Sequence, residues 1–157
     1  MTSRVDLTRG NRDALALDLL ATTGQRLRLI NIYNAPPDCD GHGDGVGALL
    51  DLAEGDSRWL AFGDFNLHHV DCTCPWCSTA TSPLAAKLAA WHDEGSYFLG
   101  LLSGSVTRSS AGGGTAIDLV LGSAAMEEAG WPDSCEVRPD LSAGSDHRPV
   151  LTTLKCG

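Results

Sequence analysis

Two neighbouring segments with apolar residues at every second position constrain the fold of this chain most strongly. Residues 13–20 place leucine at alternate positions, and residues 26–33 alternate between two apolar faces. Between them, Thr-Thr-Gly-Gln at 22–25 is typical of a turn. Two period-two segments joined by a short turn predict an antiparallel hairpin. Its second strand should end at Pro36, because proline removes a backbone donor and fixes φ.

The remaining segments predict helices alternating with short strands. A helix is expected over 46–54, closed by Gly55, and a clearer one from Ser82 to Gly95, where Ser82 can cap the helix and Pro83 suits its first turn. We expect strands at 58–62, 96–102, 105–108, 116–121, 136–138 and 149–154, with a flexible loop at 109–114. This order indicates a single mixed α/β domain, which is an ordinary size for 157 residues.

Charge and cysteine content limit the classes of function. With 20 acidic and 11 basic residues the net charge is −9, which argues against a sequence-independent nucleic-acid binder but not against a divalent-metal enzyme. No apolar run approaches the ~20 residues of a membrane span, and no secretory signal is evident. We therefore expect an intracellular protein, in the nucleus or cytoplasm, whose 6 cysteines are free thiols.

The first candidate for chemistry is the Gly-Asp-Phe-Asn sequence at 63–66, which follows a short apolar segment. Strand alternation would place Asp64 and Asn66 on one face and turn Phe65 into the core. A carboxylate beside a carboxamide can hold a water between a proton acceptor and an orienting donor, which suits attack on a phosphate. The plainer interpretation is an ordinary turn, since Asp and Asn are common turn residues.

Two further carboxylates are of interest, one at the start of a predicted strand and one within a predicted strand. Asp146 and His147 open the last predicted strand and would supply a metal ligand beside a phosphate partner. Asp118 interrupts an apolar strand, where a buried carboxylate needs a partner, and His147 is the obvious candidate. The alternatives are a solvated Asp-His pair in a loop and an edge-strand aspartate that faces water.

Tyr33 lies at the end of the second hairpin strand and could present its hydroxyl to a cleft, although an interior tyrosine would look the same. All these polar residues share one property, because each is at or near the end of a predicted strand. Several strand ends that meet at one edge of a sheet form a cleft from residues distant in sequence.

Taken together and in this order, the segments resemble the endonuclease/exonuclease/phosphatase superfamily, which includes DNase I-like nucleases and abasic-site endonucleases. The likeness lies in Asn-Ile-Tyr-Asn-Ala-Pro at 31–36, Gly-Asp-Phe-Asn-Leu-His-His at 63–69, Ala-Ile-Asp-Leu at 116–119 and Gly-Ser-Asp-His-Arg-Pro-Val at 144–150. The second of these is especially similar to the endonuclease domains of non-LTR retrotransposons, fungal ones included. The resemblance extends from about Arg26 to Leu154.

The resemblance implies a Mg²⁺- or Mn²⁺-dependent phosphodiesterase on a two-sheet α/β sandwich, acting on DNA or another phosphodiester by in-line attack of water. Asp64 would match the catalytic carboxylate near the water, and Asn66 would orient the water or the phosphate. Asp146 would be a metal ligand, and His147, oriented by Asp118, would contact the phosphate. Tyr33 would match the family's cleft tyrosine, with Asn34 as a weaker counterpart.

The chain also departs from the family pattern. In the family, an N-terminal half before the tyrosine motif supplies an early Asn and a metal-binding Glu, whereas only 32 residues precede Tyr33 here and the first glutamate is Glu54. We therefore expect a partial sandwich that corresponds to the C-terminal half. It is either an active enzyme completed by a missing N-terminal half or by a second copy in a homo-oligomer, or a folded, inactive domain that acts by binding.

A cysteine cluster supports a third interpretation. Cys72, Cys74 and Cys77, with His68 nearby, have the residue types of a zinc site, and Cys-x-x-Cys is a familiar half of one. The usual second half is missing from the sequence, so a loop of reduced cysteines is the plainer alternative. A small zinc-stabilised binding module is the function that this cluster would indicate.

Overall fold

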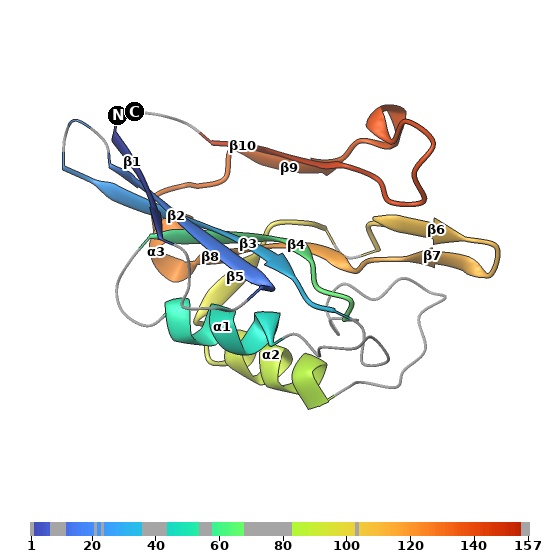
Figure 1. Cartoon of the computed structure of the whole chain (residues 1–157), viewed down its shortest axis with the longest axis horizontal. Helices are drawn as coiled ribbons and strands as arrows, with labels where there is room; N and C mark the ends of the chain where they lie inside the picture. The colour runs from blue at the N-terminus through green and yellow to red at the C-terminus, as the bar shows by residue number, and fades with distance from the viewer. Residues whose placement is uncertain are drawn as a thin grey trace.

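The computed structural model describes residues 2–6 (backbone only), 12–20, 22, 24–35, 44–53, 58–67, 83–102 and 104–154. Its centre is a six-stranded sheet in the order β1-β2-β3-β4-β8-β5. Two helices cover one face of this sheet and a two-stranded sheet, β9 with β10, covers part of the other (Figure 1). The expected two-sheet α/β sandwich is therefore present.

The large sheet is mixed in strand direction. It contains β1 (Thr2–Asp6), β2 (Ala14–Leu20), β3 (Arg26–Tyr33), β4 (Trp59–Asp64), β8 (Asp118–Ser123) and β5 (Tyr97–Leu99). Only β3 and β4 run parallel, and α1 (Gly45–Leu52) lies between them in the sequence. The other neighbouring strands are antiparallel, including the predicted β2–β3 hairpin.

The smaller elements surround this sheet. β9 (Ser134–Val137) and β10 (Val150–Thr153) form an antiparallel pair, as do β6 (Arg108–Ser110) and β7 (Gly113–Thr115), which extend beyond the edge of the large sheet (Figure 1). The remaining helices are α2 (Pro83–Asp93), the short α3 (Ala124–Glu128) and a 3₁₀ turn at Pro139–Leu141. None of the helices in these described ranges has the length and apolar character needed to cross a membrane.

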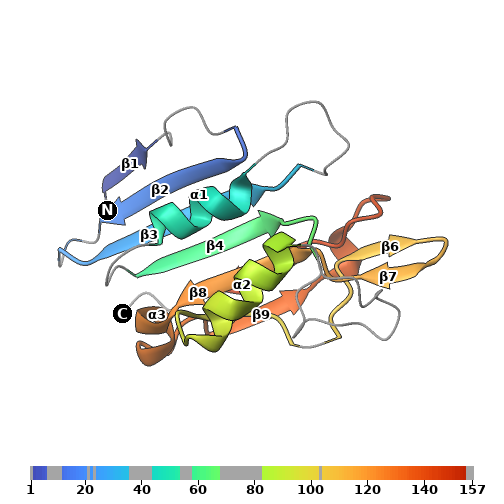
Figure 2. The ribbon, with the colours of Figure 1, turned by 90° about the horizontal axis from the view of Figure 1, so that it is seen from below.

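The main core lies between the large sheet and the helices α1 and α2 (Figure 2). Ile30, Ile32 and Leu121 from the sheet are buried against Leu49 of α1 and Leu88 of α2, as the apolar spacing of the helices predicts. Aromatic rings extend this layer: Trp59 stacks on Trp91 with centroids 5.5 Å apart, and the Trp91 ring lies 4.8 Å from that of Tyr97. This packing fixes α2 against the sheet.

A second, smaller core lies on the opposite face. Leu27, Leu60, Val120 and Met126 are buried there, and side chains of β9 and β10 such as Cys135 and Val150 pack against them. Since β9 and β10 are the only strands found on this face in the described ranges, part of the face over β2 and β3 carries exposed apolar side chains, among them Leu15. The two faces therefore differ in how completely they are covered.

The segment 109–114, strand β1 and helix α3 differ from the sequence-based expectations. Residues 109–114, expected as a flexible loop, are the facing ends and turn of the β6–β7 hairpin. Strand β1 and helix α3 were not expected, since neither carries a clear apolar period. The predicted helix cap at Ser82 lies outside the described residues, but the helix does begin at Pro83, and the turn before Ser96 contains Gly95 with φ +71°.

Candidate active site

Three polar side chains lie in one row across the large sheet. Tyr33 at the end of β3 is the register partner of Asp64 at the end of β4, and Asp64 is the partner of Asp118 at the start of β8. Register partners carry their side chains on the same face. Phe62 and Val120, two residues away on these strands, belong to the core beneath β9 and β10, so the row lies on that face. The strand ends therefore converge as expected.

The backbone after β4 is shaped by Gly63. Its φ is +140°, and a Cβ atom at this position would lie 1.9 Å from the carbonyl oxygen of Ile32 on β3. Only glycine allows such a close approach in this conformation. The absence of a side chain at Gly63 thus lets β4 pair closely with β3 immediately before Asp64.

Asn66 is held beside Asp64 by a turn rather than by strand alternation. The strand ends at Asp64, and Asn66 adopts a left-handed φ of 47°. The Asn66 amide donates to Oδ1 of Asp64 at 3.0 Å, and its Nδ2 donates to the Asn34 carbonyl at 2.9 Å. Phe65 between them is fully buried, as the sequence predicted. The geometry therefore brings both polar residues to one place by a different local structure from the one expected.

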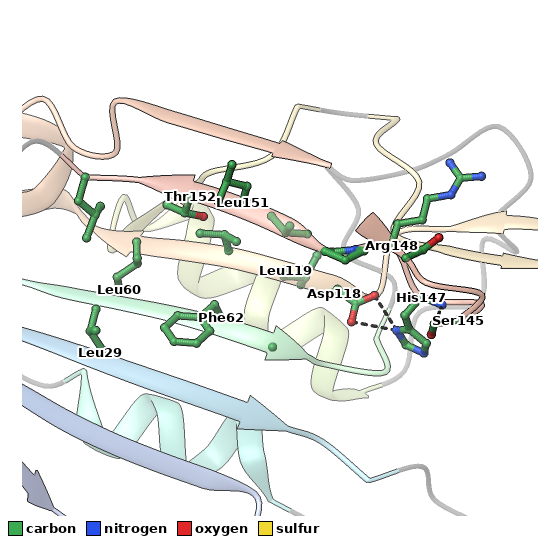
Figure 3. Close-up of a pocket in the computed structure, with 16 residues that line it drawn as sticks. Leu29, Leu60, Phe62, Asp118, Leu119, Ser145, His147, Arg148, Leu151 and Thr152 are labelled. Carbon is green, nitrogen blue, oxygen red and sulfur yellow. Dashed lines mark hydrogen bonds and ion pairs between the residues drawn. The ribbon is translucent and has the colours of Figure 1, made fainter. Parts of the chain in front are cut away.

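His147 reaches the row from the segment before β10. Its Nδ1 lies 3.0 Å from Oδ2 and 3.1 Å from Oδ1 of Asp118 (Figure 3). Its backbone amide donates to Oγ of Ser145 at 3.1 Å, and the backbone of His147 forms an isolated bridge with Arg108. The contact expected between Asp118 and His147 is present, and it leaves Nε2 as the ring nitrogen available to other groups.

Asp146 does not join this cluster directly. Its carboxylate is 53% exposed and accepts a hydrogen bond from Nε of Arg108, with 2.9 Å between Nε and Oδ2. Sequence reasoning placed Arg108 at the end of an expected strand, 105–108, but assigned it no role. The bridge to His147 shows that it borders the site. Tyr33 is 51% exposed at the end of the row, and Asn34 behind it is buried.

The charges of the site perturb one another. Burial, opposed by the hydrogen bond from the Asn66 amide, raises the pKa of Asp64 above its usual value, and the neighbouring Asp118 carboxylate acts in the same direction. Asp146 shows the opposite effect, because the hydrogen bond from Arg108 lowers its pKa. The same contact raises the pKa of Arg108, to which the fields of Asp64 and Asp118 also contribute. The site is therefore rich in carboxylates, with a cation at its border.

A divalent metal fits this donor set. One ligand atom each from Asp64, Asp118 and His147 lie within 4.8 Å of one another. Carboxylate oxygens are the ligands that Mg²⁺ and Mn²⁺ favour, and a cation would offset both the burial of Asp64 and its repulsion from Asp118, which together raise the pKa of Asp64. The zinc candidates Cys72, Cys74 and Cys77 lie outside the described residues.

An apolar groove leads away from the cluster. It has a volume of about 590 Å³ and runs between the large sheet and β10, with Asp118 and His147 at one end (Figure 3). Leu29, Leu60 and Leu151 line the rest of it. The polar cluster thus opens onto the space between the two sheets as well as onto solvent.

Comparison with known proteins agrees with this architecture. The endonuclease domain of TRAS1, a telomere-specific non-LTR retrotransposon, superposes with a TM-score of 0.67 at 17% identity, over 92% of this chain and 64% of that one. The 3′ phosphatase NExo from Neisseria, solved with a product DNA hairpin, gives 0.67 at 18% identity, over 98% and 70%. The Xenopus laevis APE2 catalytic domain gives 0.59 at 18% identity, over 92% and 58%. At these identities the likeness shows the fold.

The present chain thus spans less than two thirds of the length of the TRAS1 domain. No curated protein matches the chain in sequence. A family model, however, does match: the one described as endonuclease-reverse transcriptase covers residues 27–151, which include the whole row, Asp146 and His147. The chain therefore belongs to the endonuclease-reverse transcriptase family of the endonuclease/exonuclease/phosphatase superfamily.

Proposed function

We propose that this protein is a divalent-metal-dependent phosphodiesterase that cleaves DNA as a retroelement-type endonuclease. The observation that carries the proposal is the convergence of Asp64, Asp118 and His147, from three separate segments, within 4.8 Å. A structural role alone does not require two carboxylates to be register partners, since like charges directly opposite each other destabilise a sheet.

We assign the roles from the family resemblance, and the contacts support them. Asp64 accepts a proton from the attacking water, and Asn66, whose side chain is fixed by the Asn34 carbonyl, orients that water or the phosphate. His147, with Nδ1 held by Asp118, contacts a phosphoryl oxygen through Nε2. Tyr33, at the end of the same row, contacts the substrate.

A divalent cation would be held by carboxylates of this cluster, with Asp146 at its border as a further ligand. When bound, Mg²⁺ or Mn²⁺ stabilises the charge that develops on the phosphate. One carboxylate oxygen of Asp146 accepts from Arg108, which leaves its other oxygen for a cation.

DNA is the proposed substrate because of the relatives. The TRAS1 domain is an endonuclease of a retrotransposon, and the NExo structure contains a DNA product. The family model that matches this chain is likewise named for an endonuclease joined to a reverse transcriptase. Since the chain carries a net charge of −9, we expect its affinity for DNA to be low.

A nicking assay tests the proposal. Supercoiled plasmid is incubated with the purified chain and Mg²⁺ or Mn²⁺, beside His147→Ala and Asp64→Ala. Asp93→Ala serves as the matched control, because Asp93 is an exposed carboxylate at the end of α2, away from the row. We expect nicking by the wild type and the control that both site variants lose and that a chelator abolishes. Equal background in all four proteins would instead support the inactive, binding-only alternative.

A further inference from the structure

We propose that Arg108 binds the phosphate group of the substrate and that Asp146 is the residue that positions it. This inference rests on the proposed function of the same site. It adds a substrate-binding cation that the sequence did not indicate, on the β6–β7 hairpin, where it borders the row formed by Tyr33, Asp64 and Asp118.

Arg108 is placed next to the catalytic cluster by the backbone. It is the direct partner of His147 in an antiparallel bridge, and opposed residues of such a bridge carry their side chains toward the same side. Two further backbone bonds fix the hairpin to this segment: the Ser109 amide donates to the Asp146 carbonyl at 2.8 Å, and the Arg148 amide donates to the Thr107 carbonyl at 2.6 Å. These bonds therefore fix the backbone of Arg108 beside the backbone of His147.

The side chain of Arg108 is held by one hydrogen bond and has further donors available. Within the described part of the chain its guanidinium makes one hydrogen bond, from Nε to Oδ2 of Asp146 at 2.9 Å. Its two terminal nitrogens remain available as donors, and the side chain is 44% exposed. Because Asp146 fixes the Nε edge, the terminal pair of nitrogens is already oriented as a fork for a planar or tetrahedral oxyanion.

Arg108 is the positive group beside the carboxylates of the site. The fields of both Asp64 and Asp118 act on Arg108, so a phosphate that approaches these carboxylates also approaches the guanidinium. Without a positive group at the border, three carboxylates would repel an anionic substrate. Arg148, which directly follows His147, points away from Asp118 and His147 (Figure 3), which leaves Arg108 in the better position.

The experiment measures DNA binding without catalysis. A labelled short DNA duplex is titrated with the chain in the presence of a chelator, at several salt concentrations, for the wild type, Arg108→Gln, Arg108→Lys and Asp146→Asn. Arg26→Gln is the matched control, because Arg26 is also an exposed arginine paired with an aspartate, Asp18, and lies at the opposite end of β3 from Tyr33.

We expect Arg108→Gln to weaken binding about 10-fold and to reduce the salt slope by about 1, as loss of one phosphate contact should. Arg108→Lys should keep the slope but lose about 5-fold in affinity, because lysine lacks the fork. Asp146→Asn should weaken binding less than Arg108→Gln while keeping the slope, which a mere loss of fold would not do. Arg26→Gln should change neither quantity.

Several outcomes would overturn the inference. They are equal effects of Arg108→Gln and Arg26→Gln, full affinity in Arg108→Lys, and no measurable duplex binding by the wild type. Failure of the proposed function can be distinguished from failure of this inference. If the wild type does not nick DNA with any metal but Arg108→Gln still loses binding, the inference about Arg108 stands alone. If the wild type nicks DNA and Arg108→Gln leaves both duplex affinity and KM unchanged, the proposed function stands and the inference about Arg108 is wrong.

Discussion

Nδ1 of His147 lies between the two carboxylate oxygens of Asp118, at 3.1 Å from Oδ1 and 3.0 Å from Oδ2. A carboxylate in this position fixes the orientation of the imidazole and places a proton on Nδ1, so that Nε2 is left without a proton and available to other groups. The two residues are 29 positions apart in sequence. Asp118 begins β8, whereas His147 lies in the segment before β10, which is bridged to Arg108 of the β6–β7 hairpin. The pair therefore depends on the β6–β7 hairpin and β8 being correctly assembled.

Asp118→Asn should disturb the orientation and tautomer of His147 without unfolding the protein. The amide keeps the size of the carboxylate but can present its NH₂ group to Nδ1, which favours the wrong tautomer. We expect plasmid nicking to fall about 100-fold or more while the thermal midpoint changes little. Nitrogen NMR of His147 should show the proton moving from Nδ1 to Nε2. Full activity in this variant would show that Asp118 does not act through the histidine.

The fold was predictable where the apolar period is strong. The β2–β3 hairpin and the helix beginning at Pro83 follow directly from side-chain spacing and turn residues. The β6–β7 hairpin was missed because serine and glycine have weak strand preference, so that its formation depends on contacts such as the Thr107 amide with the Thr115 carbonyl. Such tertiary contacts leave no local pattern in a sequence.

The site was predictable only in part for a similar reason. Asp64 and Asp118 lie at strand ends and His147 lies shortly before one, so their convergence could be inferred from the topology that the motifs imply. The attachment of Asp146 to Arg108 could not, because an exposed carboxylate can pair with any cation that the fold brings near it. The left-handed turn at Asn66 was also missed, since strand alternation accounts equally well for a buried Phe65.

Asp64→Asn should stabilise the protein at neutral pH. The folded pKa of Asp64 is raised above 3.8, mainly by burial, so the folded state binds the proton more tightly than the unfolded state. The stability that this provides is complete below the unfolded pKa and is lost as the pH rises through the folded pKa. The ionised carboxylate therefore destabilises the fold at pH 7, where an amide does not.

The effect should be on the order of 0.5 kcal/mol, because the side chain is only half-buried and solvent screens its neighbours. Urea unfolding of Asp64→Asn and the wild type at pH 7 and pH 3 measures it. We expect the difference in the free energy of unfolding at pH 7 to vanish at pH 3. A variant that is less stable than the wild type at pH 7 would contradict the sign argued above.

Gly63→Ala should disrupt the site through the backbone. A methyl group at Gly63 would lie 1.9 Å from the Ile32 carbonyl oxygen, so β3 and β4 must move apart or the φ of +140° must change. We expect a loss of about 3 kcal/mol in the free energy of unfolding, together with loss of nicking. Gly112→Ala, where the nearest atom is 3.9 Å from the added carbon, is the control and should stay within about 0.5 kcal/mol. Equal stability of the two variants would show that the approach of β4 to β3 is not restrictive.

Asp18 should stabilise the sheet at the end remote from the site. It is the register partner of Arg28, which donates to both its oxygens from Nε at 2.8 Å and Nη2 at 3.1 Å, and Arg26 also pairs with it. The side chain of Asp18 is only 16% exposed. Arg28 also reaches the Leu52 carbonyl at the end of α1, so the pair joins the sheet to the helix that covers it.

We expect Asp18→Asn to lower the free energy of unfolding by about 1–2 kcal/mol at pH 7, because two arginines lose their charged partner. The hydrogen bond from Arg28 is the main cause of the lowered pKa of Asp18, so its stabilisation is present above the unfolded pKa of 3.8 and is lost as the pH falls through the folded value. The wild type should therefore lose its advantage over the variant in acid, the opposite of the dependence expected at Asp64. Asp93→Asn, an exposed carboxylate on α2, should show neither change. A constant difference between Asp18→Asn and the wild type across this range would show that the aspartate acts by shape and not by charge.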